Sequence, residues 1–267
     1  MPRPRLIILS DLDGTLLDHH GYGFEPARPV LARLERLNIP VVLSSSKTAA
    51  EMAQIAALMP GVARWPFVCE NGAGIVWPDD AAQTDREDWH RLRAFMQCLP
   101  SDLRGCLTGF GDLGPDGIAA ATGLSRASAV LAGERQFSEP CLWTGDDAGL
   151  KRLARECAAH GIKAQQGGRF LTLGFGHTKA SRVDDVRRAL AAEMIVALGD
   201  APNDRDMIAA ADMGVVVPNP AGPAPNGFGP DANIIHAPAP GPAGWAGAVT
   251  TILDDIGFDE KGKTAHG

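Results

Sequence analysis

Residues 6–15 of the chain read LIILSDLDGT, and this stretch decides the fold class. Its first four residues, Leu6 to Leu9, form a short continuous apolar run, which is typical of a parallel strand covered by helices on both faces. Two carboxylates, Asp11 and Asp13, follow the run. We therefore expect an acidic site at the carboxyl end of a parallel sheet, where open α/β folds bind their ligands.

Short apolar runs of the same kind recur along the chain and alternate with helical patterns. A second run lies at Val41–Leu43, and the apolar side chains from Val30 to Leu37 recur between the two runs at the spacing of one helix face. This order predicts the strand–helix–strand crossover of a βαβ unit, and so an α/β fold with a parallel sheet. Further strands are predicted at Phe67–Cys69, Gly74–Trp77, Met194–Leu198 and Met213–Val217, the first two as a hairpin around Asn71-Gly72.

The middle of the chain has a different pattern. Helical stripes at Leu92–Leu99 and Leu150–Cys157 are separated by turn-rich segments, as in an α+β domain. We therefore predict an inserted domain at residues 82–170 within a core made of residues 1–81 and 171–267. Residues 218–244, which are rich in proline and glycine, predict a long irregular connection before a last helix near Val249.

Composition excludes several classes of function. The 25 basic and 32 acidic residues give a formal charge of −7, whereas nucleic-acid binding requires a basic excess or stripe. Five cysteines without a CxxC pair indicate neither a disulfide framework nor a thiolate zinc site, so we expect a reducing cytoplasm. The apolar run at Leu6–Leu9 is too short for a signal peptide or a membrane span, and no membrane partner is expected.

Two acidic motifs carry the predicted chemistry. Carboxylates two residues apart, as in Asp11 and Asp13, can share one cation while one attacks as a nucleophile and the other transfers a proton. The motif Gly199–Asp204 also follows a buried strand, so its acids are expected at the same sheet edge. Each motif alone is compatible with a solvated acidic turn. Together they favour a site for Mg²⁺, which prefers carboxylates, water and phosphate oxygens.

The ordered set of Asp11-Leu12-Asp13-Gly14-Thr15, Ser45, Lys179 and Gly199-Asp200-x-x-Asn203-Asp204 resembles the four motifs of the haloacid dehalogenase-like phosphatases. These motifs extend over nearly the whole chain. The resemblance implies a Rossmann-like core with a parallel sheet and an inserted α+β cap of the C2 type at residues 82–170, which would close over the site and select the substrate.

The same resemblance implies a role for each motif residue. Asp11 would form an aspartyl-phosphate, and Asp13 would protonate the leaving alcohol and then activate water. Ser45 and Lys179 would bind the transferring phosphoryl oxygens and offset their charge. The Mg²⁺ ligands implied by the resemblance are Asp11, the main-chain carbonyl of Asp13, and Asp200, with Asp204 in support.

Shorter strings resemble the mannosyl-3-phosphoglycerate phosphatase family. They are Ser45–Thr48 with Glu51, Glu70–Gly72, Arg135–Pro140, Gly167–Phe170 and His177–Lys179. The implied reaction is hydrolysis of mannosyl- or glucosyl-3-phosphoglycerate to the glycosylglycerate and phosphate. Bidentate contacts from Arg135 and Arg169 would bind the glycerate carboxylate. The remaining expected substrate contacts are Lys47, Thr48, Glu51, Asn71, Ser138 and Asn203.

Three alternatives remain open at this stage. The substrate can be another sugar phosphate, or the enzyme can be a phosphomutase that returns the phosphoryl group to its substrate. A non-catalytic binding module on the same fold is the third, although such a module has no need of the full set Asp11, Asp13, Lys179 and Asp200. The expected partner is a phosphorylated small molecule, and the protein is expected to be a monomer or a homodimer.

Overall fold

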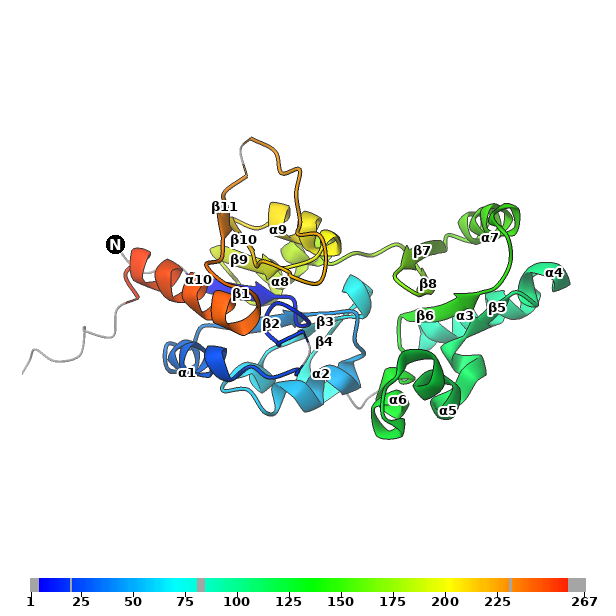
Figure 1. Ribbon diagram of the computed structural model, residues 1–267, viewed down its shortest axis with the longest axis horizontal. Helices are drawn as coiled ribbons and strands as arrows, with labels where there is room; N and C mark the ends of the chain where they lie inside the picture. Colours follow the sequence, from blue (N-terminus) through cyan, green and yellow to red (C-terminus); the bar gives the residue numbers. More distant parts are fainter. Residues whose placement is uncertain (1–4, 20, 81–84, 231, 259–267) are drawn as a thin grey trace, which may run out of the picture. The chain divides into compact units, whose positions relative to one another are not determined.

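The structure is a computed structural model that describes residues 5–19, 21–80, 85–230 and 232–258. In these ranges the chain forms one seven-stranded sheet, one four-stranded sheet and the helices that cover them (Figure 1). The predicted α/β fold is confirmed. By its internal contacts the chain divides into two units, one of residues 1–45, 55–66 and 179–267, the other of residues 46–54 and 67–178.

The seven-stranded sheet has the order β11-β10-β9-β1-β2-β3-β4. Its central strand β1 (Leu6–Ser10) is buried along its whole length and pairs in parallel with strands on both sides. The strand order reverses at β1, so the crevice between the ends of β1 and β9 is the topological switch point where such sheets bind ligands. The neighbouring parallel strands are β2 (Val41–Ser44), β9 (Met194–Gly199), β10 (Met213–Val216) and β11 (Ile234–His236).

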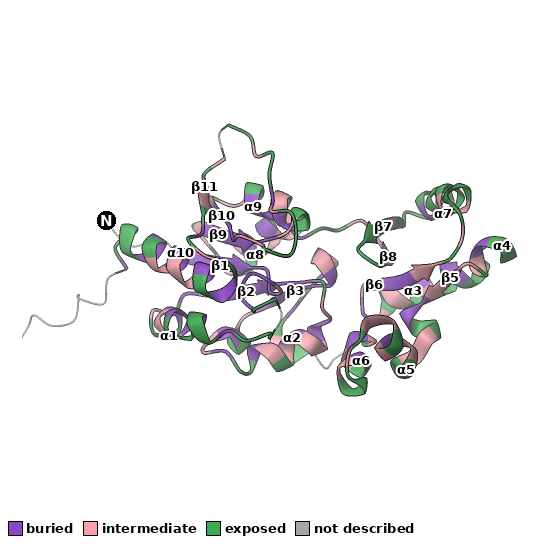
Figure 2. Ribbon diagram, viewed as in Figure 1, coloured by how far each residue is buried: buried purple, intermediate pink, exposed green. Residues whose placement is uncertain are grey.

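Helices cover the strands of the first unit. The helix α1 (Arg28–Arg36) lies in the chain between β1 and β2, which confirms the predicted βαβ crossover. The last helix, α10 (Gly241–Asp255), buries Trp245 completely. Figure 2 shows the buried interior along β1, β9 and β10. The remaining helices of this unit are α8 (Val183–Ala189) and α9 (Arg205–Ala210).

The second unit has its own sheet, of order β5-β6-β8-β7, in which all neighbours are antiparallel. Apolar side chains of α3 (Glu87–Cys98) and α7 (Asp147–Ala159) pack with those of the sheet into one buried cluster. The described part of the predicted insertion 82–170 lies in this unit, and its role as a cap stays a prediction. The other elements are α2 (Ala49–Ala56), α4 (Ser101–Arg104), β5 (Leu107–Gly109), α5 (Phe110–Thr122), α6 (Arg126–Ala132), β6 (Ser138–Trp143), β7 (Lys163–Gly167) and β8 (Phe170–Gly174).

One predicted connection is confirmed and another is wrong in part. The strands β3 (Phe67–Cys69) and β4 (Gly74–Val76) form the predicted antiparallel hairpin. The segment 218–244 is not irregular throughout, because β11 pairs with β10 and α10 already begins at Gly241. A three-residue strand has too few positions to show alternation, and Pro242 fits the first turn of a helix, where no backbone donor is needed.

Within the described ranges, no helix combines the length and the apolar character needed to cross a membrane. No disulfide joins any of the five cysteines, all of which lie in the described ranges. The predicted cytoplasmic location and the monomer or homodimer stay predictions.

Candidate active site

Two loops bring carboxylates together at the switch point of the sheet. Asp11 follows β1 and Asp200 follows β9, and these strands pair in parallel with Ser10 opposite Leu198. The Asp11 amide also donates a 2.9 Å hydrogen bond to the Leu198 carbonyl, which ties the start of one loop to the neighbouring strand. Carboxylate oxygens of Asp11, Asp200 and Asp204 all lie within 4.8 Å of one another, and the three residues are buried.

A tight turn after β1 shapes the first loop. The Leu12 carbonyl accepts hydrogen bonds from the amides of Thr15, Leu16 and Leu17. Gly14 adopts a φ of +84°, and a Cβ there would lie 2.4 Å from Oδ2 of Asp200. Glycine is therefore required both by the backbone conformation and by the close approach of the second loop.

Lys179 lies between two of the three carboxylates. Its side chain is 3% exposed, and Nζ donates to Oδ1 of Asp11 at 2.5 Å and to Oδ1 of Asp204 at 2.7 Å. Asp204 is held in turn through Oδ2, which accepts from the amides of Asp200 and Ala201. The fold therefore brings Lys179 beside Asp11 and Asp204, and its predicted role in binding the phosphoryl oxygens stays a prediction.

Burial governs the charge state of this cluster. It raises the pKa of Asp11 to about 8, against the opposing effect of the Lys179 ammonium. Burial also raises the pKa of Asp200. For Lys179, burial acts to lower the pKa, but the carboxylates of Asp11 and Asp204 outweigh it, and the pKa is raised. The ammonium is therefore retained.

The carboxylates fit a hard divalent cation. When all three carboxylates are ionised, they and the Lys179 ammonium carry a net formal charge of −2, which a divalent cation balances. All the side-chain donors are oxygens, the ligand type that Mg²⁺ prefers. Asp13 is half-buried on the turn beside Leu17, and Asn203 is exposed in the short 3-10 turn Pro202–Asp204. Their predicted roles stay predictions.

Sequence reasoning missed three of the side chains that orient the cluster, those of Asn219, Trp245 and Ser10. Asn219 donates from Nδ2 to Oδ2 of Asp200 at 2.7 Å, and the Thr15 hydroxyl donates to Oδ1 at 2.9 Å. The Trp245 indole N–H donates to Oγ of Ser10, which donates to the Asp11 carbonyl. Asn219 lies in the Pro/Gly-rich segment, where no local pattern distinguishes it.

The residues of the second sequence motif follow β2. Ser45 is buried and directly follows this strand, so it lies at the same edge as Asp11. The Thr48 amide donates to Oε2 of Glu51 at 2.9 Å, and the Glu51 amide donates back to the Thr48 hydroxyl. This pair is a capping box at the start of α2, and the Thr48 hydroxyl also reaches the Leu131 carbonyl. Lys47 is half-buried in the same loop.

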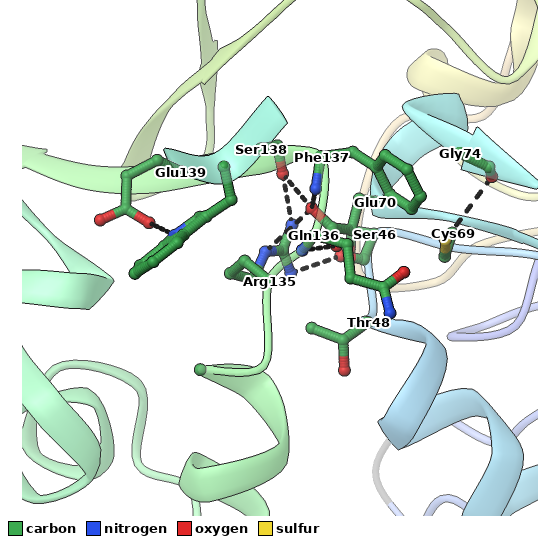
Figure 3. A network of polar contacts seen from close by, with 12 residues as sticks. Ser46, Thr48, Cys69, Glu70, Gly74, Arg135, Gln136, Phe137, Ser138 and Glu139 are labelled. Atoms are coloured by element: carbon green, nitrogen blue, oxygen red, sulfur yellow. Dashed lines mark hydrogen bonds and ion pairs between the residues drawn. The ribbon is translucent and has the colours of Figure 1, made fainter. Parts of the chain in front are cut away.

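The other predicted substrate contacts lie in the second unit. Arg135 and Ser138 take part in a buried polar network around Glu70 (Figure 3). Asn71 follows Glu70 with a φ of +59°. Arg169 is exposed, and its guanidinium donates to the Thr122 carbonyl at 3.2 Å. The structure thus assembles the motif residues of the core, whereas the predicted substrate contacts divide between internal networks and exposed positions.

This fold and this carboxylate site define a haloacid dehalogenase-like hydrolase, and the chain belongs to that family; residues 8–91 match the family model of that description. A curated phosphatase from Persephonella marina, named glucosyl-3-phosphoglycerate/mannosyl-3-phosphoglycerate phosphatase, is 32% identical over 94% of this chain and 98% of its own. A protein of the same name from Methanococcoides burtonii is 30% identical over 92% and 97% of the two chains. The predicted enzyme class, phosphoric monoester hydrolase, agrees with both.

Solved structures agree on the fold. A haloacid dehalogenase-like hydrolase from Bacteroides thetaiotaomicron superposes with a TM-score of 0.61 at 18% identity. The match covers 95% of this chain and all of the other. At this level of identity the likeness concerns the fold alone, and it confirms the predicted class of architecture over nearly the whole chain.

Proposed function

We propose that the chain is a Mg²⁺-dependent phosphomonoesterase that hydrolyses glucosyl-3-phosphoglycerate or mannosyl-3-phosphoglycerate to the glycosylglycerate and phosphate. The observation that carries the chemistry is the buried contact of Lys179 with Asp11 beside two further carboxylates at the switch point. The names of the two relatives support the substrate class. Five cysteines without a disulfide favour a reducing cytoplasm as its location.

In the first step, a carboxylate oxygen of Asp11 attacks phosphorus while the bond from phosphorus to the ester oxygen breaks. The departing alkoxide takes a proton from Asp13, so that the glycosylglycerate leaves as an alcohol. Lys179 donates to the carboxylate that attacks and offsets negative charge on the transferring phosphoryl group. The product of this step is an aspartyl-phosphate.

In the second step, water attacks the phosphorus of the aspartyl-phosphate. Asp13 takes the proton from this water, the bond between phosphorus and the Asp11 oxygen breaks, and free phosphate leaves the regenerated carboxylate. Asp13 is half-buried, so water can reach it, whereas Asp11 is 7% exposed. Ser45, buried at the end of β2, would donate its hydroxyl to a phosphoryl oxygen in both steps.

The residues that would hold the metal are Asp11, Asp200 and Asp204, with the main-chain carbonyl of Asp13. Mg²⁺ bound there would favour the ionised carboxylates and offset charge on the phosphoryl oxygens. Burial raises the pKa values of Asp11 and Asp200, and a cation bound beside them would act in the opposite direction.

The substrate is tested by phosphate release in the presence of Mg²⁺. Glucosyl- and mannosyl-3-phosphoglycerate are compared with hexose phosphates and 3-phosphoglycerate. The expected kcat/KM for the glycosides exceeds that for hexose phosphates roughly 100-fold, because the carboxylate and the sugar both add contacts. Comparable hydrolysis of hexose phosphates would instead indicate a general sugar phosphatase. Phosphoryl return to the sugar would indicate a mutase, and no turnover would indicate a binding module.

A further inference from the structure

The carboxylate of Glu70 is completely buried and is bound by one short segment of the chain (Figure 3). Its Oε1 accepts from the Gln136 amide at 2.8 Å, and its Oε2 accepts from the Phe137 amide at 3.2 Å and from the Ser138 hydroxyl at 2.7 Å. Arg135 forms an ion pair with the same Oε2 at 3.3 Å. Burying a carboxylate is costly without such compensation, so these contacts hold the segment 135–138 firmly on Glu70.

The guanidinium of Arg135 is directed at three separate groups. Nε faces Glu70, Nη2 donates to Oγ of Ser138 at 2.7 Å, and Nη1 donates to the Ser46 carbonyl at 3.1 Å. The side chain is 6% exposed. Two nitrogens of the guanidinium thus donate to protein groups, and the third, Nε, lies against the Glu70 carboxylate without a hydrogen bond. This buried arrangement suits an internal contact better than a receptor for a carboxylate from solvent.

The Glu70–Arg135 pair contacts the loop that follows Ser45. Arg135 holds the Ser46 carbonyl, and the Glu70 amide donates to the next carbonyl, that of Lys47, at 2.9 Å. Glu70 makes this contact with a φ of +52°, a conformation that residues other than glycine seldom adopt and that persists only where surrounding contacts impose it. Two consecutive peptide carbonyls after Ser45 are thus held by the two residues of one buried ion pair, the first by the Arg135 guanidinium and the second by the Glu70 main-chain amide.

We propose that the Glu70–Arg135 ion pair positions the loop of Ser45 and thereby supports binding of the phosphoryl group of every substrate. Arg135 is then a positioning residue that acts through the Ser46 carbonyl, in place of the carboxylate contact expected from the sequence. The proposal rests on the phosphatase activity proposed above, but it does not depend on which phosphomonoester is the natural substrate.

A second buried ion pair in the same unit provides a matched control. Arg93 donates to Glu139 at 3.0 Å, and the Glu139 side chain is completely buried, as that of Glu70 is. The other partners of Glu139 are the Trp89 indole and the Gly111 amide. This pair therefore also joins an arginine to a completely buried carboxylate, although the Arg93 side chain is 17% exposed and also pairs with Asp112. Its hydrogen bonds are to groups outside the loop after Ser45.

The test compares Arg135→Lys and Glu70→Gln with Arg93→Lys and Glu139→Gln. For each variant, KM and kcat are measured on p-nitrophenyl phosphate, which has no carboxylate, and on glucosyl-3-phosphoglycerate. The inhibition constant of inorganic phosphate is measured alongside, and thermal unfolding reports stability. Lys keeps the charge of Arg135 but cannot reach three acceptors in different directions, and Gln keeps the shape of Glu70 without its charge.

We expect Arg135→Lys and Glu70→Gln to raise KM for both substrates and the inhibition constant of phosphate by a similar factor, roughly ten-fold or more. The control substitutions, Arg93→Lys and Glu139→Gln, should lower thermal stability and leave the inhibition constant of phosphate unchanged. A loss confined to glucosyl-3-phosphoglycerate, with phosphate inhibition unchanged, would overturn the proposal and assign Arg135 to the carboxylate. An equal loss of phosphate binding in the control variants, or no loss in any variant, would overturn it as well.

The test still distinguishes the outcomes if one variant does not fold or if the wild type does not prefer glucosyl-3-phosphoglycerate. If Arg135→Lys does not fold, Glu70→Gln and Ser138→Ala are compared with the control variants instead. Ser138→Ala removes one hydroxyl from the same network. If the wild type shows no preference for glucosyl-3-phosphoglycerate, the proposed substrate fails, but p-nitrophenyl phosphate and inorganic phosphate still report on the loop. The failure of the substrate assignment and the failure of the positioning role are thus distinguishable.

Discussion

Asn219 donates a 2.7 Å hydrogen bond from its side-chain amide to Oδ2 of Asp200. The other oxygen of this carboxylate accepts from the Thr15 hydroxyl at 2.9 Å. Both donors are neutral, so they orient Asp200 without supplying the positive charge that a metal ion would bring. Outer partners of this kind set the direction of a ligand and tune metal affinity.

Replacing Asn219 by Leu is expected to weaken Mg²⁺ binding roughly ten- to hundred-fold, the usual effect of removing an outer partner of a metal ligand. Isothermal titration of the purified protein with Mg²⁺ alone measures this directly. Asn233→Ala is the control, because Asn233 is exposed and its side-chain amide bonds only the Asp212 carbonyl, at 3.4 Å. Unchanged Mg²⁺ affinity in Asn219→Leu would show that Thr15 alone suffices.

Asp11→Asn is expected to abolish turnover while leaving the fold intact, because the amide has the shape of the carboxylate but cannot act as the nucleophile. Phosphate release and thermal unfolding are measured on the same preparation. Asp13→Asn should also cripple turnover, and it should slow hydrolysis of the aspartyl-phosphate, since one residue serves both steps. Activity of Asp11→Asn near that of the wild type would refute the role of Asp11.

Chelation with EDTA is expected to stop catalysis, and Mg²⁺ should restore it. Ca²⁺ should inhibit, because calcium accepts more ligands in looser geometry and would misplace the Asp11 carboxylate for in-line attack. Mg²⁺ should also raise the unfolding temperature of the wild type more than that of Asp200→Asn, since an ion that binds only the folded state stabilises it. Full activity in metal-free buffer would contradict the assignment of Asp200.

Arg169→Ala is expected to cost about 1.5–3 kcal/mol of binding for a substrate with a carboxylate, the scale of a hydrogen bond to a charged group. The predicted effect is a ten- to hundred-fold fall in kcat/KM for glucosyl-3-phosphoglycerate, with little change for p-nitrophenyl phosphate. Arg126→Ala, an exposed arginine paired with Asp116, serves as the control. Equal losses on both substrates would place the effect of Arg169 elsewhere than at the carboxylate.

The stability of the chain should depend on pH through Glu139. Burial raises the pKa of this carboxyl above 4.5, although Gly111, Trp89 and Arg93 oppose the shift. The folded state therefore binds the proton more tightly than the unfolded state. The free energy of unfolding, relative to Glu139→Gln, should fall as the pH rises from about 4.5 to the raised value and then level off. Urea unfolding of both proteins from pH 4 to 8 measures the difference, and a difference that grows with pH would refute the argument.

Much of the core could be predicted because strands and their ends have local signatures. Apolar runs such as Leu6–Leu9 identify buried parallel strands, and the polar residues after them must then meet at one sheet edge. The convergence of Asp11, Lys179 and Asp200 follows from this rule together with the family motifs. The short strand β11 escaped prediction because its three residues show no period.

The sequence by itself determined the family, the α/β class and the carboxylates of the core, because each is written in a contiguous run of residues or an ordered set of motifs. Only the tertiary structure decided that Asn219 orients Asp200 and that Arg135 pairs with Glu70. The physical reason is that a polar side chain takes its partner from whatever groups packing brings within hydrogen-bond distance, and burial then makes that partner obligatory. Residues that are distant in the chain come into contact in this way, and no local sequence pattern predicts the contact.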